Sequence, residues 1–307
     1  MSTPAVFFPT SLDEAADVLD AYDGTAKLVA GGTALTLMIQ QRLVAPQALV
    51  SLRDVPGLRS VELDGEVVRV GALVTHAEAA RHPLLRRHVP VVADAFAVVG
   101  NAQVRAAATV GGVLAEADYA SDPPAVLRAL NAEVTAHGTG GARTIGVDEL
   151  LLGFYQTALG ESELISEVRV PLPPAGSGSA YLKYTSRSGE DRPCVGVAAV
   201  VALDRDGACR DLRIAVGAAC QVPVRLAEVE RSAVGRPLDA AVLTELSDAY
   251  AGAVDPVADV RGTAWYRTEM VRVWVRRAVE VARERADSGR PTDVDADAGE
   301  NLRGSTK

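Results

Sequence analysis

The chain has 307 residues, of which 31 are Lys or Arg and 40 are Asp or Glu, so its net charge is −9. This length predicts about two domains and a core large enough to need no disulfide or structural metal. An acidic chain is a poor candidate for binding nucleic acid or anionic lipid. Hydrophobic residues make up 48% and charged residues 23%, a balance typical of an ordinary soluble globule.

The cysteines exclude some redox sites. Cys194, Cys209 and Cys220 form no C-x-x-C pair, and an iron–sulfur cluster held only by cysteines needs four thiolates. We therefore expect neither such a cluster nor another metal site. A sparse, odd count fits a reducing compartment. Residues 1–10 lack the pattern of a signal peptide, and the longest apolar run, 194–203, is shorter than the ~20 residues of a membrane span. The expected location is the cytoplasm, with no membrane span.

The first 56 residues predict a small βαβ unit. Ser11 and Glu14 are spaced as a capping box at the start of a helix. A strand, a glycine pair, a second helix that Thr33 can cap, and another strand follow. The expected ranges are 27–30 for the first strand, 31–32 for the turn, 33–41 for the helix and 48–52 for the last strand.

Residues 57–175 predict a mixture of strands and helices. Asp64-Gly65 between two strand-like runs is a strong hairpin signal. Asp122-Pro123-Pro124 places an N-cap residue ahead of two prolines that suit a first helical turn. The expected elements are a hairpin over 61–70, helices beginning near 75, 90 and 122, a glycine-containing loop over 100–112 and a strand over 163–170.

A segment rich in proline, glycine and serine at 171–179 is the best domain boundary. Beyond it we expect three strands, two helices and one long helix over 264–286, whose apolar stripe faces a core. The predicted organisation is a domain over 1–175 with subdomains 1–56 and 57–175, a C-terminal domain over 176–286, and a disordered tail over 287–307.

Two glycine pairs are the strongest candidates for binding a ligand. The first, Ala30-Gly31-Gly32-Thr33-Ala34, lies between a strand and a helix, where main-chain amides can cradle phosphate oxygens. The second, Thr109-Val110-Gly111-Gly112-Val113, is followed by Glu116, Asp118 and Asp122. It offers amide donors for a pyrophosphate and acceptors for sugar hydroxyls. Neither pair is a G-x-G-x-x-G or Walker A motif, and each alone could be an ordinary turn, with Asp122 only capping its helix.

The other polar residues give weaker signals. Lys183 lies in a predicted strand; a cation near the pyrimidine end of a flavin would stabilise negative charge on the reduced ring, but an outward-facing lysine is the simpler alternative. The four histidines are scattered and have no nucleophile motif near them. We therefore expect no catalytic acid, base or nucleophile in this chain.

Four segments, in order, resemble the medium, flavin-carrying subunit of molybdenum hydroxylases, the family that includes carbon monoxide dehydrogenase and xanthine dehydrogenase. Residues 28–58 and 102–130, which contain the glycine pairs, resemble its two FAD-binding segments. Residues 181–201 resemble its third segment, and 264–282 its final helix. The similarity extends over about residues 4–285, and four segments in the same order are specific.

The resemblance implies an α+β fold: an FAD-binding fold of the p-cresol methylhydroxylase/vanillyl-alcohol oxidase type with two subdomains, followed by a small α+β C-terminal domain. It implies non-covalent FAD, with the pyrophosphate held by both glycine motifs, an acidic residue near the ribityl chain and a lysine near the isoalloxazine. The implied FAD-binding residues are Ala30, Gly31, Gly32, Thr33, Ala34, Thr109, Val110, Gly111, Gly112, Val113, Asp122 and Lys183.

The implied function is electron transfer within a heterotrimeric molybdopterin hydroxylase. Electrons would come from [2Fe-2S] clusters of a small partner subunit, fed by molybdopterin in a large one, and pass through FAD to NAD, oxygen or a quinone. A dimer of heterotrimers is the expected assembly. Two alternatives stay open: a stand-alone flavin oxidase of the same fold, favoured by Tyr155, Tyr181 and Tyr184, and a non-catalytic nucleotide-binding relative.

This sequence departs from the family's pattern at three places. Ala34 stands where many members have Asp or Ser, which removes a side-chain contact but leaves the amides. Tyr119 replaces a proline between the two carboxylates of the second segment. The loop over 187–192, where relatives often place an aromatic residue against the flavin, contains none.

Overall fold

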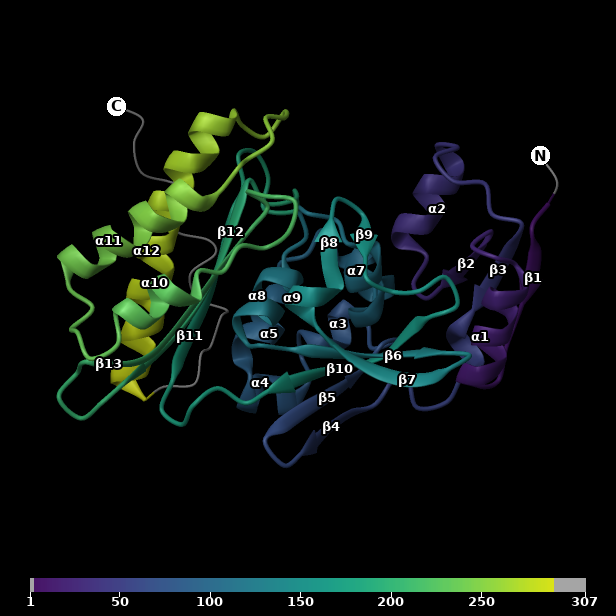
Figure 1. Ribbon diagram of the computed structural model, residues 1–307, viewed down its shortest axis with the longest axis horizontal. Helices are drawn as coiled ribbons and strands as arrows, with labels where there is room; N and C mark the ends of the chain where they lie inside the picture. The colour runs from purple at the N-terminus through teal and green to yellow at the C-terminus, as the bar shows by residue number, and fades with distance from the viewer. Residues whose placement is uncertain (1–2, 290–307) are drawn as a thin grey trace.

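In the computed structural model, which describes residues 3–289, the chain forms three units in a row (Figure 1). The N-terminal unit is a three-stranded sheet with the order β1-β3-β2, in which β3 pairs in parallel with both neighbours. This confirms the predicted βαβ arrangement. Its elements are β1 (Ala5–Phe7), α1 (Leu12–Ala21), β2 (Ala26–Val29), α2 (Thr33–Gln40), β3 (Ala48–Ser51) and the 3-10 helix η1 (Leu52–Asp54).

The two helices of this unit are held differently. α1 buries Ala15, Ala16 and Leu19, and two of these, Ala15 and Leu19, join a core that includes residues of β2 and β3. α2 buries none of its residues, although most of them are apolar, and it rises away from the sheet (Figure 1). Its N-cap is Gly32 in the left-handed conformation, with φ at 70°, and not Thr33 as expected. Glycine adopts this φ without steric cost, so Thr33 becomes the first helical residue.

The middle unit is an antiparallel sheet with the strand order β4-β5-β10-β6-β7 and a layer of short helices. The largest hydrophobic core lies between this sheet and those helices. Its elements are β4 (Val61–Asp64), β5 (Val67–Gly71), α3 (His76–Ala79), α4 (Pro83–His88), α5 (Pro90–Ala97), α6 (Ala102–Ala107), α7 (Val110–Glu116), α8 (Pro123–Ala129), β6 (Glu133–Gly138), β7 (Gly141–Gly146), α9 (Val147–Leu150), β8 (Leu151–Gly153), β9 (Gln156–Thr157) and β10 (Leu164–Pro171).

The segment expected as a loop over 100–112 is helical instead. Asn101 caps α6 by accepting a hydrogen bond from the amide of Val104, and Thr109 caps α7 through the amide of Gly112. The second glycine pair therefore lies in the first turn of α7 and not in a turn between elements. Glycine is a poor helix former, so the sequence alone predicts a loop here, but the two side-chain caps and the surrounding core favour the helix.

The C-terminal unit is the antiparallel sheet β11-β12-β13 with helices on one face. The expected stripe of α12 is buried against this sheet. On the other face, Ala198, Val200 and Ala215 belong to the core of the middle unit, where α8 packs on β12 and β13. The elements are β11 (Gly178–Tyr184), β12 (Val195–Leu203), β13 (Cys209–Gly217), α10 (Ala227–Ser232), α11 (Ala240–Ala253) and α12 (Ala264–Ser288).

The ends of the units bear on the predicted domain organisation. The segment over 172–177 connects β10 to β11. α12 continues to Ser288, two residues beyond the expected helix end, so the predicted tail cannot begin at 287. Most of that tail, residues 290–307, lies outside the described residues. None of the described helices is long and apolar enough to cross a membrane.

Candidate functional site

A cavity of about 540 Å³ lies where the three units meet. The N-terminal unit contributes the first glycine motif, the middle unit the second motif and Asp122, and the C-terminal unit Lys183. All of the predicted FAD-binding residues line this cavity except Val110. Segments far apart in the sequence are therefore brought to one hollow of the molecule.

The first glycine motif presents unpaired main-chain donors to the cavity. Gly32 offers no side-chain cap, and across residues 3–289 the amides of Thr33, Ala34 and Leu35 donate to no acceptor. The N-terminus of a helix carries a partial positive charge in addition to these free donors. The arrangement suits an anion such as a phosphate group, and it does not depend on the side chain that Ala34 lacks.

Gly31 joins the first motif to the middle unit. A Cβ atom added there would lie 1.9 Å from the carbonyl oxygen of Ala107, at the end of α6. That distance is far inside van der Waals contact, so only glycine lets the two backbones meet at this point. The close approach fixes the position of the first motif relative to the second.

The second glycine motif is built differently, because its amides are already paired. The amide of Val110 donates to the carbonyl oxygen of Val74 at 2.9 Å, and that of Gly111 donates to Ala72 at 2.9 Å. The amide of Gly112 donates to the Thr109 hydroxyl at 3.2 Å. The expectation of free amide donors here is therefore wrong for these three groups. Gly111 is needed for close packing, since an added Cβ would lie 2.5 Å from that of Ala72.

Asp122 and Lys183 form a buried ion pair beside the cavity. Lys183 Nζ lies 3.1 Å from Asp122 Oδ2 and donates to the carbonyl oxygen of Val98 at 2.8 Å. The Tyr181 hydroxyl donates to Asp122 Oδ1 at 2.7 Å. Asp122 stands at the N-cap position of α8, but its side chain caps no amide. Lys183 points inward to Asp122 and Val98 instead of outward to solvent. Neither of the simpler alternatives, a capping aspartate or an outward-facing lysine, is therefore found.

The environment of Asp122 shifts its titration. Burial raises the pKa of Asp122 to about 6, while Lys183 and the Tyr181 hydroxyl act in the opposite direction. The carboxylate is thus ionised at pH 7 and opposes the charge of Lys183. From the sequence, Tyr181 was considered only in support of the stand-alone oxidase. Gly196 leaves the space that the Tyr181 hydroxyl occupies, because a Cβ atom added at Gly196 would lie 2.4 Å from that oxygen.

Three further charged residues line the cavity near the end of α7. Arg192 Nη2 lies 2.8 Å from Asp118 Oδ2, and Asp118 Oδ1 accepts a hydrogen bond from the amide of Ala120 at 3.1 Å. Glu116 lies close to both. Asp118 and Glu116 follow the second glycine motif in sequence, but Arg192 comes from the connection between β11 and β12. Because Arg192 and Asp118 lie far apart in the chain, no local sequence pattern predicts their salt bridge.

His76 also lines the cavity, and sequence reasoning missed it. Its ring is buried, and Nε2 lies 3.2 Å from the carbonyl oxygen of Thr109. A carbonyl only accepts, so Nε2 carries the proton. Burial lowers the pKa of His76 to about 4, and the imidazole is neutral at pH 7. It holds the cap residue of α7 in place.

Tyr119 connects the carboxylate-bearing loop to the C-terminal unit. Its hydroxyl donates to Asp259 Oδ2 at 3.2 Å and accepts a hydrogen bond from Arg261 at 2.8 Å. Its ring packs edge-on against Phe154 at 5.0 Å. Although burial opposes the shift, hydrogen bonds from Arg261 and Arg267 hold the pKa of Asp259 below its usual range. Tyr119 therefore anchors the segment between Asp118 and Asp122 instead of pointing into the cavity.

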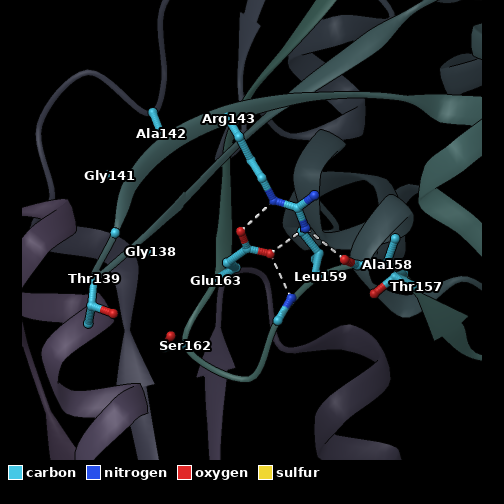
Figure 2. Close-up of a pocket in the computed structure, with 12 residues that line it drawn as sticks. Gly138, Thr139, Gly141, Ala142, Arg143, Thr157, Ala158, Leu159, Ser162 and Glu163 are labelled. Atoms are coloured by element: carbon cyan, nitrogen blue, oxygen red, sulfur yellow. Dashed lines mark hydrogen bonds and ion pairs between the residues drawn. The ribbon is translucent and has the colours of Figure 1, made fainter.

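A second hollow lies elsewhere, between the β6–β7 hairpin and the segment that leads into β10 (Figure 2). Its volume is about 610 Å³. Arg143 and Glu163 face each other in it: Arg143 donates to both carboxylate oxygens of Glu163, at 2.6 and 2.8 Å, and to the carbonyl oxygen of Ala158. These charged groups satisfy one another and none of the predicted residues is present, so we place the candidate site at the first cavity.

Both halves of the chain match known families. Residues 2–173 match the FAD binding domain in molybdopterin dehydrogenase, and residues 180–282 match the CO dehydrogenase flavoprotein C-terminal domain. The chain is 36% identical over 283 residues to the nicotine 6-hydroxylase medium subunit of Paenarthrobacter nicotinovorans, covering 91% of this chain and 98% of that protein. It is 32% identical to the carbon monoxide dehydrogenase medium chain of Afipia carboxidovorans, covering 91% and 96%.

Solved structures give the same result. Carbon monoxide dehydrogenase from Hydrogenophaga pseudoflava, in a form that lacks the Mo-pyranopterin moiety of its cofactor, contains a chain similar to this one with a TM-score of 0.90 and 31% identity, covering 92% of this chain and 98% of that one. The predicted α+β fold, an FAD-binding domain followed by a C-terminal domain, is confirmed. The chain belongs to the family of FAD-binding medium subunits of molybdenum hydroxylases and is an oxidoreductase flavoprotein component.

Proposed function

We propose that this chain is the electron-transfer subunit of a heterotrimeric molybdopterin hydroxylase. It receives electrons from [2Fe-2S] clusters of a small partner subunit, fed by molybdopterin in the large one, and passes them to NAD, oxygen or a quinone. The expected assembly is a dimer of heterotrimers in the cytoplasm. The observation that supports this function is the meeting of an uncapped helix N-terminus, Asp122 and Lys183 in one cavity.

The residues of the cavity fit a dinucleotide. The free amides of Thr33 and Ala34 suit the pyrophosphate. The second motif contributes shape through its tightly packed glycines, and Asp118 and Asp122 beyond it offer acceptors for ribose or ribityl hydroxyls. We therefore assign the phosphate-binding donors to the first motif and a positioning role to Val110, Gly111 and Gly112.

FAD, when bound, supplies a centre that accepts and donates electrons. The chain's own contribution is electrostatic. Lys183 places a fixed positive charge at the cavity, and Asp122, held by Lys183 and Tyr181, orients it. A cation there stabilises negative charge that develops on a reduced ring. Because no histidine or cysteine falls within either glycine motif, we propose that the flavin is held without a covalent bond.

The contacts of the three tyrosines argue against the stand-alone oxidase. That alternative depends on a tyrosine available to a substrate, but Tyr181 donates to Asp122, Tyr184 pairs with Tyr266, and Tyr155 lies 3.4 Å from Asp118. The departures from the family pattern at Ala34 and Tyr119 would favour the non-catalytic alternative, but neither residue removes a main-chain donor from the first motif.

The test is a titration of the full chain with FAD and, separately, with FMN, in which quenching of the flavin fluorescence reports binding. We expect FAD to bind at least about tenfold more tightly than FMN, because only FAD carries the pyrophosphate and adenosine. Acid denaturation should release all of the flavin. The lone chain should oxidise no organic substrate. Absence of FAD binding would favour the non-catalytic alternative, and substrate oxidation by the lone chain would favour the oxidase.

A further inference from the structure

Of the carboxyl groups that line the cavity, those of Glu116 and Glu190 have no partner among the described residues, and Glu190 is exposed whereas Glu116 is partly buried. Glu116 is the last residue of α7 and lines the cavity together with Asp118. Within the described part of the chain, its side chain makes neither a hydrogen bond nor an ion pair. Two carboxyl groups are therefore close to a single guanidinium, that of Arg192.

That guanidinium is committed to Asp118. Arg192 lies 2.8 Å from Asp118 Oδ2, and Asp118 Oδ1 accepts from the amide of Ala120 and from the Tyr155 hydroxyl, at 3.1 and 3.4 Å. Three donors thus contact Asp118, and none among the described residues contacts Glu116. The two neighbouring carboxyl groups therefore lie in unequal surroundings, and of the two only Glu116 is left without a donor.

The surroundings bring Glu116 close to its midpoint at neutral pH. Burial, followed by the neighbouring charge of Asp118, raises the pKa of Glu116 to about 7, while Arg192 acts in the opposite direction. Tyr155 is the other titratable group that faces it. A group at its midpoint responds most strongly to a change of charge nearby, and reduction of a flavin in the same cavity is such a change.

We propose that Glu116 takes up a proton from solvent whenever the flavin in this cavity is reduced and releases it on reoxidation. This inference rests on the proposed function. Two electrons from the one-electron carriers of the partner subunit, with one solvent proton that forms an N–H bond, convert FAD to FADH⁻. A second solvent proton forms an O–H bond on the Glu116 carboxylate. Two negative and two positive charges enter the cavity, so its net charge is unchanged, and reoxidation reverses both steps.

The experiment is a spectroelectrochemical titration of the full chain loaded with FAD, between about pH 6 and pH 9. The slope of the midpoint potential against pH gives the protons taken up per two electrons. Near pH 8, about one unit above the pKa of Glu116 in the oxidised protein, proton uptake by the wild type should approach two, whereas Glu116→Gln should take up only one. Glu190→Gln is the matched control: Glu190 lines the same cavity but is exposed, so its charge is screened, and it should behave as the wild type.

Infrared difference spectra, reduced minus oxidised, give a second readout. The C=O band of a protonated carboxyl should appear in the wild type and in Glu190→Gln and be missing in Glu116→Gln. Uptake of one proton throughout in the wild type, or equal slopes in the wild type and Glu116→Gln, overturns the proposal. If Glu116→Gln binds no FAD, the infrared measurement is repeated on wild-type protein labelled with ¹³C at its glutamate carboxyls. A C=O band that does not shift on labelling does not come from a glutamate and therefore excludes Glu116. A wild-type chain without FAD binding contradicts the proposed function instead.

Discussion

Asp122 and Lys183 meet at 3.1 Å across the boundary between the middle and C-terminal units, with both side chains almost fully buried. Asp122 precedes α8 in the middle unit, and Lys183 lies on β11. The pair therefore links the two units at the wall of the candidate flavin cavity. Its stability matters both for the fold and for the charge presented to the cofactor.

Breaking this pair from one side should be costly. Asp122→Asn or Lys183→Met alone leaves a buried charge without its partner, and we expect each to lower the free energy of unfolding by about 3–5 kcal/mol. Asp122→Asn/Lys183→Met should lose less than the sum of the two single changes, because neither charge remains. Urea denaturation at pH 7 of the four proteins measures this coupling as a double-mutant cycle. Additive losses would mean that the two residues act independently.

Gly31→Ala should disrupt the junction between the N-terminal and middle units. Its new Cβ would overlap the carbonyl oxygen of Ala107, and relief of that overlap moves the first glycine motif. We expect a loss of about 1–3 kcal/mol in the free energy of unfolding and at least about tenfold weaker FAD binding.

Gly140→Ala is the matched control for this change. A Cβ at Gly140 meets no atom within 4 Å, so the same substitution should leave both quantities nearly unchanged. Fluorescence titration with FAD and thermal unfolding compare the two variants. Equal FAD affinity in Gly31→Ala and wild type would show that the close approach of the two backbones does not position the binding groups.

His76 should make the stability of the chain depend on acid. The folded pKa of about 4 lies below the unfolded value of 6.5, so between these pH values the unfolded chain binds a proton that the folded chain does not. Stability is therefore lost as pH falls from 6.5 to 4, by about 3 kcal/mol in total.

Urea denaturation of wild type and His76→Gln across this pH range isolates the effect. Asp94, Asp122 and Glu116 have raised pKa values and contribute with the opposite sign, but these contributions are shared by both proteins and cancel in the difference. The difference between wild type and His76→Gln should shrink as pH falls. A constant difference would mean that His76 does not change its protonation on unfolding.

Local patterns in the sequence were enough to predict much of the fold. The helix start at Ser11, the hairpin at Asp64-Gly65 and the stripe of the last helix depend on neighbours in the chain, and each lies where it was predicted. The caps expected of Thr33 and Asp122 do not form. The second glycine pair was misjudged, because Thr109 and the carbonyl groups of Ala72 and Val74 hold Gly111 and Gly112 in a helix that their propensity disfavours.

The candidate site was only partly predictable. Its glycine motifs and Lys183 follow from the order of segments along the chain. The partners that define the site do not, because Arg192 reaches Asp118 and Tyr181 reaches Asp122 only once the units have packed together. In the sequence, Glu116 is one of several acidic residues after the second glycine motif. That it lacks a partner follows only from the folded structure, in which Arg192 pairs with Asp118 and not with Glu116.

The helix α2 should become ordered by the cofactor. It buries none of its residues, Leu37 is 55% exposed, and its first amides have no acceptor among the described residues. Few buried contacts and unpaired main-chain groups are the marks of a segment that opens easily. A bound pyrophosphate would cap the helix, and the flavin would cover Leu35 and Met38, which line the cavity. Hydrogen exchange in residues 33–40 should therefore be fast without FAD and slow with it.

The neighbouring helix α1 provides the internal control for this experiment. It belongs to the same unit but buries Ala15, Ala16 and Leu19, so its amides should be protected to the same extent with and without FAD. Exchange measured by mass spectrometry on one sample compares both helices directly. If α2 is already protected in the absence of FAD, or gains no protection when FAD binds tightly, the helix is stabilised by contacts other than those with the cofactor.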